Sequence, residues 1–162
     1  AKNSKASLVF FKRTENPTLI YDYTTYRYGN YVNKVTYEGF EFEYKNKIFA
    51  AVDLRFNYTY NETTSGNLIN LPKHAFGGVL DYDLSALFHF NASVQHIGSR
   101  RSLSDSKLNP YTLFDYKLTR TFFDQKLTAF IIITNALDAQ YVEIENFSTQ
   151  GRNFRIGFNF SF

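Results

Sequence analysis

The sequence has 162 residues, of which 18 are Phe and 13 are Tyr, and it contains no Cys, Met or Trp. The absence of Cys excludes disulfide bonds, thiolate catalysis and cysteine-based zinc sites. The formal net charge is only +3, and Lys and Arg are interspersed with Asp and Glu, so we expect no nucleic-acid partner. The longest uncharged run in the second half has about 11 residues, short of the ~20 that a membrane-spanning helix needs.

Alternation of apolar and polar side chains with a period of two recurs along the whole chain and indicates β-strands. We expect strands at approximately residues 4–21, 31–45, 48–61, 73–83, 86–97, 110–121, 126–137 and 151–162. No segment shows the i, i+3, i+4 spacing of an amphipathic helix. The pattern therefore predicts an all-β domain without an internal linker.

The two faces of each predicted strand differ sharply in polarity. In the third strand, Val52, Leu54, Phe56, Tyr58 and Tyr60 alternate with Asp53, Arg55, Asn57 and Thr59. The last segment alternates in the same way, with Phe154, Ile156, Phe158, Phe160 and Phe162 on one side. The seventh strand departs, because Phe130 and Ile132 lie on the side that should be polar.

The connections between strands alternate between two lengths. Short turns are expected around Asn46–Lys47, Leu84 and Asp124, and longer joins begin near Tyr23, Glu62, Gly98 and Asp138. Short joins therefore lie at one end of the sheet and long joins at the other. This asymmetry is typical of outer-membrane barrels, which have brief periplasmic turns and longer outward loops.

The number of large aromatic residues indicates which solvent the apolar face meets. An eight-stranded barrel has an interior just filled by ordinary side chains, and these rings would overfill it. Turned outward, they would meet lipid, with Tyr60, Tyr82 and Tyr111 in the interfacial aromatic girdles. The polar face would then line the lumen and would include Asp53, Arg55, Asp81, Asp83, Asp115, Lys117 and Arg155. We therefore predict an antiparallel transmembrane β-barrel.

Four ordered segments in the second half carry a family resemblance: "LPKH" (71–74), "HIGSR" (96–100), "TNALDAQYVE" (134–143) and "GRNFRIGFNFSF" (151–162). Their order and spacing resemble the closing region of the β-barrel of TonB-dependent outer-membrane receptors. The upstream segment "VNKVTYEGFEFE" (32–43) also resembles a strand of these receptors. Departures from the family pattern are Ala136, Ala139 and the apolar Ile132.

The resemblance implies a plugged barrel of about 22 strands, of which residues 1–162 would be the last eight. The plug domain and the earlier strands would lie outside this chain. The implied function is TonB-dependent import of a scarce nutrient, such as an iron-siderophore, haem or cobalamin, across the bacterial outer membrane, with no enzymatic activity and no cofactor. Implied partners are membrane lipid, the plug and remaining strands, and the TonB complex through the plug. The barrel-assembly machinery would recognise the terminal strand, including Phe158, Phe160 and Phe162.

Two clusters in the long joins are candidates for ligand binding. Tyr26, Arg27 and Tyr28 could stack on a ligand, or could pack the loop. Arg100 and Arg101 could hold an anionic chelate through charge-assisted hydrogen bonds, or could be ordinary surface charges. The three His residues lack metal-ligand spacing, so no metal site is expected.

Two alternatives stay open. The chain could be a complete eight-stranded outer-membrane barrel with a structural or adhesive role. It could also be a soluble β-barrel carrier, which would require the aromatic faces to point inward.

Overall fold

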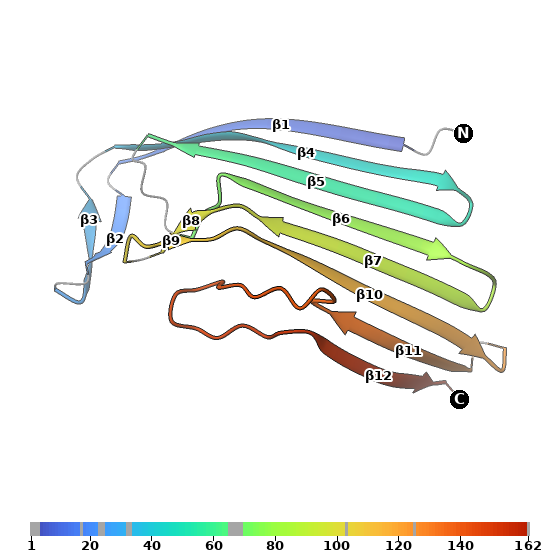
Figure 1. The fold of residues 1–162 in the computed structure, drawn as a ribbon. Helices are drawn as coiled ribbons and strands as arrows, with labels where there is room; N and C mark the ends of the chain where they lie inside the picture. The colour runs from blue at the N-terminus through green and yellow to red at the C-terminus, as the bar shows by residue number, and fades with distance from the viewer. Residues whose placement is uncertain are drawn as a thin grey trace.

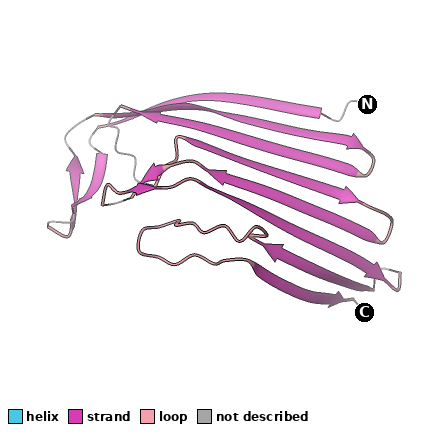
Figure 2. Cartoon of the chain, viewed as in Figure 1, coloured by secondary structure: helices cyan, strands magenta, loops and turns pink. Residues whose placement is uncertain are grey.

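The computed structural model describes residues 4–16, 18–22, 25–31, 34–64, 70–102, 104–124 and 126–161, and these form an all-β structure (Figures 1 and 2). No helix in this part of the chain is long and apolar enough to cross a membrane. Eight strands form one antiparallel sheet: β1 (Ser4–Glu15), β4 (Val35–Phe49), β5 (Val52–Thr63), β6 (His74–Asp83), β7 (Phe88–Ile97), β10 (Tyr111–Phe122), β11 (Leu127–Thr134) and β12 (Asn153–Phe160).

The strands of this sheet follow one another in chain order, with β1 and β12 at its two edges. The described strands therefore form an open, curved sheet rather than a closed barrel, which does not fit a complete eight-stranded barrel (Figure 1). Two small hairpins project from the long joins. They are β2 (Thr18–Asp22) with β3 (Arg27–Tyr31), and β8 (Arg100–Arg101) with β9 (Lys107–Leu108).

The two ends of the sheet differ as the join lengths predict. The three short turns, at residues 50–51, 84–87 and 123–124, lie at one end, which we call the turn end (Figure 1). The small hairpins and residues 135–152, which we call the closing loop, lie at the opposite end, which we call the loop end. Both chain ends lie at the turn end.

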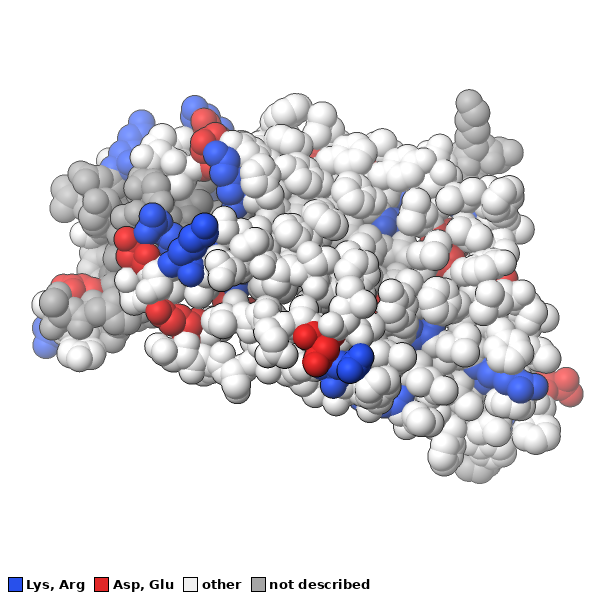
Figure 3. Space-filling view, viewed as in Figure 1, with Lys and Arg blue, Asp and Glu red and all other residues white. Residues whose placement is uncertain are grey.

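The strand register separates an apolar face from a polar face. Residues that pair across neighbouring strands lie on the same face, as Phe56 and Gly78 do, and Leu80 and Ala92. The same pairing of apolar with apolar residues continues across the sheet. The apolar face carries Phe42, Phe56, Leu80, Val94, Phe114, Tyr116, Ile131, Ile156, Phe158 and Phe160. In Figure 3 charged side chains are few in the middle of the sheet; many gather toward the loop end on the left, and a smaller number lie below and at the right.

Burial shows that the apolar face does not form a soluble core. Among the described hydrophobic residues, only Val35 and Leu108 are buried, whereas Phe10 is 74% exposed and Ile156 is 80% exposed. Apolar side chains exposed to this extent are unfavourable in water, so this face is covered by an apolar solvent or by a partner. Within the described residues the aromatic faces are therefore not packed inward, as a soluble β-barrel carrier would require.

Several details of the sequence-based prediction are wrong. The first turn is at Ala50–Ala51 rather than at Asn46–Lys47, because the ladder continues through Lys47, which pairs with Asp53. The predicted strand 4–21 is divided into β1 and β2, and residues 27–31 form a strand of their own inside a predicted join.

A further detail concerns Tyr111, which does not lie in an outward aromatic girdle. Its register partner is Ile97 on the polar face, and its ring lies 4.5 Å from the ring of Tyr141 in the closing loop. Tyr60 and Tyr82 lie on the apolar face as predicted, since they share it with Phe76 and Phe90.

Candidate ligand-binding site

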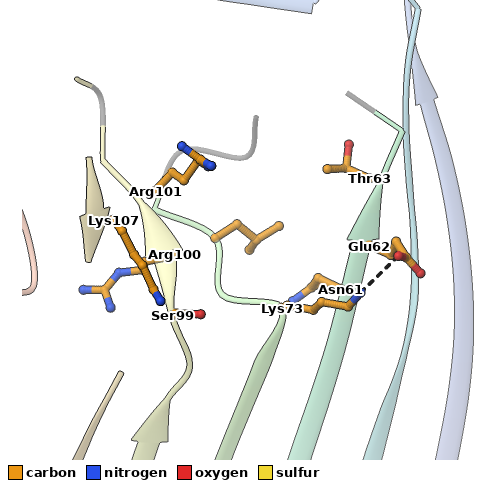
Figure 4. A pocket seen from close by; sticks show the side chains of 9 residues that line it. Asn61, Glu62, Thr63, Lys73, Ser99, Arg100, Arg101 and Lys107 are labelled. Atoms are coloured by element: carbon orange, nitrogen blue, oxygen red, sulfur yellow. Dashed lines mark hydrogen bonds and ion pairs between the residues drawn. The ribbon is translucent and has the colours of Figure 1, made fainter. Parts of the chain in front are cut away.

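A hollow of about 400 Å³ lies at the loop end, between the ends of β5 and β6 on one side and β8 and β9 on the other (Figure 4). We call it the loop-end pocket. Its lining is Asn61, Glu62, Thr63, Leu71, Lys73, Ser99, Arg100, Arg101 and Lys107. Four of these residues are cationic and one is acidic, so the lining has an excess of positive charge.

Lys73 and Glu62 form an ion pair on one side of the pocket. The Nζ of Lys73 lies 3.1 Å from Oε1 of Glu62 and 5.4 Å from the centre of the Tyr60 ring (Figure 4). The hydrogen bond to Glu62, together with contacts to Tyr60, raises the pKa of Lys73 above its usual value. Lys73 therefore stays charged throughout the physiological pH range.

Arg101 and Lys107 lie directly opposite each other in the β8–β9 hairpin. Like charges at opposed positions of a strand pair repel, which is unfavourable unless an anion lies between or beside them. Asp105 balances one of the two, since Nη1 of Arg101 lies 2.9 Å from its Oδ1. Within the described part of the chain Lys107 has no ion-pair partner, so it is available to an external anion.

Arg100, although adjacent to Arg101, is held differently. It is only 6% exposed, and its Nη2 donates to the carbonyl oxygens of Val142 and Glu143 at 3.0 and 2.7 Å. Its guanidinium carbon lies 5.3 Å from the centre of the Tyr111 ring. The Arg100 side chain thus fixes the closing loop to β8, and only part of it lines the pocket.

The closing loop is also anchored at its start by Asn135, which is 4% exposed. The Asn135 amide donates to the Ala139 carbonyl at 2.9 Å, and its Oδ1 accepts from the Ala139 amide at the same distance. Its backbone amide donates to Oδ1 of Asp115 at 2.8 Å. The backbone of Asn135 has φ of 48°, a left-handed conformation that Asn tolerates better than most residues.

The serine-rich segment at residues 102–106 adds a further tie to the closing loop. The Ser104 hydroxyl donates to Oε2 of Glu145 at 2.6 Å. This hydrogen bond, and to a smaller extent a hydrogen bond from Ser102, lowers the pKa of Glu145. The tie therefore persists at all pH values above the usual range of a carboxyl group.

A network of polar side chains joins β5, β6 and β7 on the polar face, near the turn end. Arg55 on β5 is bonded to Asp81 on β6, and Asn91 on β7 donates to Oδ1 of Asp81 at 2.7 Å. His89 lies 3.5 Å from Asp81 and 2.8 Å from Asp83. These five residues pair with one another on a face that keeps contact with water.

Comparison with protein families resolves the class of the protein. Residues 3–136 match the model of the family described as TonB dependent receptor-like, beta-barrel. The chain belongs to the TonB-dependent receptor family. Members of this family are outer-membrane β-barrels that serve transport rather than enzymatic catalysis, so the apolar face meets lipid and the chain is a sector of such a barrel. No curated protein sequence matches the chain.

Solved structures with the same fold are receptors of this TonB-dependent kind. The ferric-catecholate import receptor Fiu of E. coli K12, in its closed form, has a TM-score of 0.78 and 20% identity over 99% of this chain and 25% of its own. The siderophore receptor PiuA of Acinetobacter baumannii has a TM-score of 0.80 and 17% identity over 98% of this chain and 26% of its own. The ferripyoverdine receptor of Pseudomonas aeruginosa has a TM-score of 0.77 and 18% identity over 96% of this chain and 24% of its own. The TonB-dependent receptor sector described here thus spans about a quarter of their length.

The structure brings together only some of the residues that the sequence singles out for ligand binding in this TonB-dependent receptor. Arg101 and part of Arg100 line the loop-end pocket. Tyr26, Arg27 and Tyr28 lie instead on the separate β2–β3 hairpin and do not line it. Tyr26 and Tyr28 are 78% and 71% exposed there.

Sequence reasoning missed Lys73 and Lys107 as pocket residues. Lys73 stands in the "LPKH" segment, where its place before a strand could have signalled a position at the loop end. Lys107 carried no such signal, because its position follows from the pairing of two-residue strands that the sequence does not reveal. No group of three or more His, Asp or Glu side chains able to hold a metal ion occurs among the described residues.

The residues predicted to line the lumen share the polar face. Asp53 pairs with Asp81, Asp115 pairs with Ser93, and Lys117 and Arg155 both lie opposite Ile132. Asp115 and Arg155 also line a second hollow of about 470 Å³ beneath the closing loop.

Two of the residues predicted to form an assembly signal lie on the lipid-facing side of β12. Phe158 is 73% exposed and Phe160 is 53% exposed. Phe162, the third member, lies outside the described residues. Recognition of this strand by the barrel-assembly machinery stays a prediction.

Proposed function

We propose that this chain is the C-terminal sector of a receptor that imports an anionic ferric siderophore by TonB-dependent transport. The observation that carries the proposal is the loop-end pocket, where Lys73, Arg101 and Lys107 gather in a barrel of this family. Cationic side chains that are poorly matched by acids favour an anionic ligand over a neutral one. This preference, together with structural neighbours that are named siderophore receptors, supports a ferric siderophore rather than haem or cobalamin.

Each part of the sheet has a role in the proposed transport. The ligand is captured at the loop end, where Arg101 and Lys107 contribute charge. The polar face, with Asp53, Arg55, Asp81, Asp115, Lys117 and Arg155, lines the path through the barrel beside a plug that lies outside this chain. The TonB complex acts on that plug, and the residues of this sector form the wall against which the plug moves.

Binding of defined ligands to the complete receptor tests the proposal. Radiolabelled ferric catecholate and ferric pyoverdine-type siderophores are compared with haem and cyanocobalamin on cells that express the receptor. We expect saturable binding of a ferric siderophore, and we expect Arg101→Gln combined with Lys107→Gln to weaken it by about tenfold, because two charge-assisted contacts are lost.

The matched control is Lys45→Gln, which removes a cation on the polar face near the turn end, remote from the loop-end pocket. This variant should bind as the unchanged receptor does. Binding of haem or cobalamin without any siderophore would overturn the assignment of the ligand class. Equal loss of binding in the control would show that the loop-end pocket is not the capture site.

A further inference from the structure

Arg120 is a charged side chain on the face that otherwise meets lipid. Its register partners are Phe88 on β7 and Ala129 on β11, and its neighbours on the same side of β10 are Leu118 and Phe122. It is exposed. An arginine in such surroundings is costly unless it reaches polar groups.

The contacts of Arg120 are aromatic rather than ionic. Its guanidinium carbon lies 4.9 Å from the centre of the Phe88 ring and 4.6 Å from that of the Phe122 ring. Within the described part of the chain, no carboxylate lies within ion-pair distance of it. Two ring faces orient the guanidinium and shield its stem, but they do not satisfy its N–H donors.

The height of Arg120 in the sheet places it near one boundary of the membrane. It lies two residues before the end of β10, and its partner Phe88 is the first residue of β7. Both positions belong to the turn end, which is the periplasmic side in outer-membrane barrels. Lipid phosphates are concentrated at this boundary, and a guanidinium binds phosphate with two parallel hydrogen bonds.

A hollow in the apolar face lies farther along the same strands. It measures about 640 Å³, and its apolar lining includes Phe56, Leu80, Val94, Phe114 and Tyr116. Gly78 and Ala92 also line it, and because glycine has no side chain and alanine only a methyl group, they leave space that larger residues would fill.

The distance between the two features fits one lipid molecule. Tyr116 precedes Arg120 by four residues, or roughly 13 Å along the strand. One leaflet of the hydrocarbon core is roughly 15 Å thick, half of the full ~30 Å. A lipid whose headgroup lies at Arg120 therefore has an acyl chain long enough to enter the hollow.

We propose that Arg120, framed by Phe88 and Phe122, binds the phosphate of a periplasmic-leaflet phospholipid whose acyl chain lies in the hollow at Gly78 and Ala92. The positive charge of Arg120 matches the phosphodiester, and the hollow matches the chain. The inference depends on the outer-membrane position of the sheet and not on the transported ligand.

Native mass spectrometry of the complete receptor, purified in mild detergent with its lipids, tests this site. The unchanged receptor should retain phospholipid, and Arg120→Gln should retain about tenfold less, because a charge-assisted contact is lost. Arg120→Lys should retain an intermediate amount, since an ammonium binds phosphate without the paired geometry. Ala92→Phe, which fills the hollow, should weaken retention of long-chain phospholipid more than retention of a short-chain one.

Lys45→Gln is the control, because it removes a cation from the opposite face of the sheet near the same end. It should retain as much lipid as the unchanged receptor, and added inorganic phosphate should not displace that lipid. Equal retention by Arg120→Gln and the unchanged receptor would overturn the proposal. Displacement by inorganic phosphate would also overturn it, since the site would then be one for free phosphate. Siderophore binding by the same variants is measured in parallel, so that failure here is distinguishable from failure of the transport proposal.

Discussion

The turn end of this sheet is stabilised by contacts between residues close in the sequence, and the loop end by contacts between residues far apart in the sequence. The β6–β7 turn closes through hydrogen bonds between Ser85 and Phe88, three residues apart, in both directions at 3.3 Å. At the loop end, Arg100 bonds to Glu143, 43 residues away, and Ser104 bonds to Glu145, 41 residues away. The turn end can therefore form as soon as adjacent strands meet, whereas the loop end forms only after the sheet has brought β8 and the closing loop together.

The largest expected effect is loss of the Asn135 anchor at the loop end. Asn135→Ala removes the paired side-chain bonds to Ala139 and places Ala at positive φ, for a cost of about 3 kcal/mol. Hydrogen exchange of the closing loop in the complete receptor should rise strongly, while exchange in β4 and β5 stays slow.

Asn135→Gly is the matched variant, because Gly adopts positive φ freely but makes no side-chain bonds. Its cost should be smaller than that of Asn135→Ala. Equal costs would show that backbone conformation contributes nothing at this position, and an unchanged closing loop in both variants would contradict the role of Asn135 as an anchor.

A smaller effect separates the adjacent arginines. Arg100→Ala removes two charge-assisted bonds to closing-loop carbonyls and should cost about 2 kcal/mol of local stability. Limited proteolysis should then cleave the closing loop near Val142 and Glu143 faster. Arg101→Ala should leave cleavage unchanged, because its contacts lie within its own hairpin. Equal exposure of the closing loop in both variants would contradict the distinct role of Arg100 in holding that loop.

The smallest effect is expected at the turn end. The Ser85 hydroxyl accepts from the amides of Leu87 and Phe88 at 3.3 and 3.2 Å. Ser85→Ala should cost about 0.5–1 kcal/mol, since the main-chain bonds of the turn remain. Thermal unfolding of the receptor followed by its heat-dependent gel mobility should shift little, and the loop end should show no change in hydrogen exchange. A change at the loop end would mean that the two ends are coupled.

The sequence was sufficient to predict the main sheet because strand periodicity is a local signal. The apolar and polar faces of β5 appear in the alternation from Val52 to Tyr60, and the register reproduces them. The predicted departure of the seventh strand is also confirmed, since Phe130 and Ile132 both lie on the polar face. The turn predicted at Asn46–Lys47 is wrong because Asn, although typical of turns, lies here within a continuing strand. Its side-chain amide donates to the Tyr44 hydroxyl at 2.9 Å.

The loop end was less predictable because its contacts join distant residues. In the sequence the adjacent residues Arg100 and Arg101 look equivalent. In the structure, of these two, only Arg100 donates hydrogen bonds to carbonyl oxygens of the closing loop. The pairing of Arg101 with Lys107 depends on a hairpin of two-residue strands, too short for any periodicity. The position of Tyr111 near a strand end predicts a lipid-facing ring. Tyr111 instead lies on the same side of β10 as Asp115 and Lys117, which is the polar face.

Phe130 and Gly157 lie opposite each other in β11 and β12, and a Cβ on Gly157 would come within 2.5 Å of the Phe130 ring. The ring thus occupies the space that a side chain would take. A slip of β12 by two residues would keep every apolar residue on its proper face, so alternation alone cannot prevent it. Such a slip would bring Arg155 or Asn159 under the ring, where their side chains collide with it. The fit of one ring over one glycine therefore favours a single register between the last two strands.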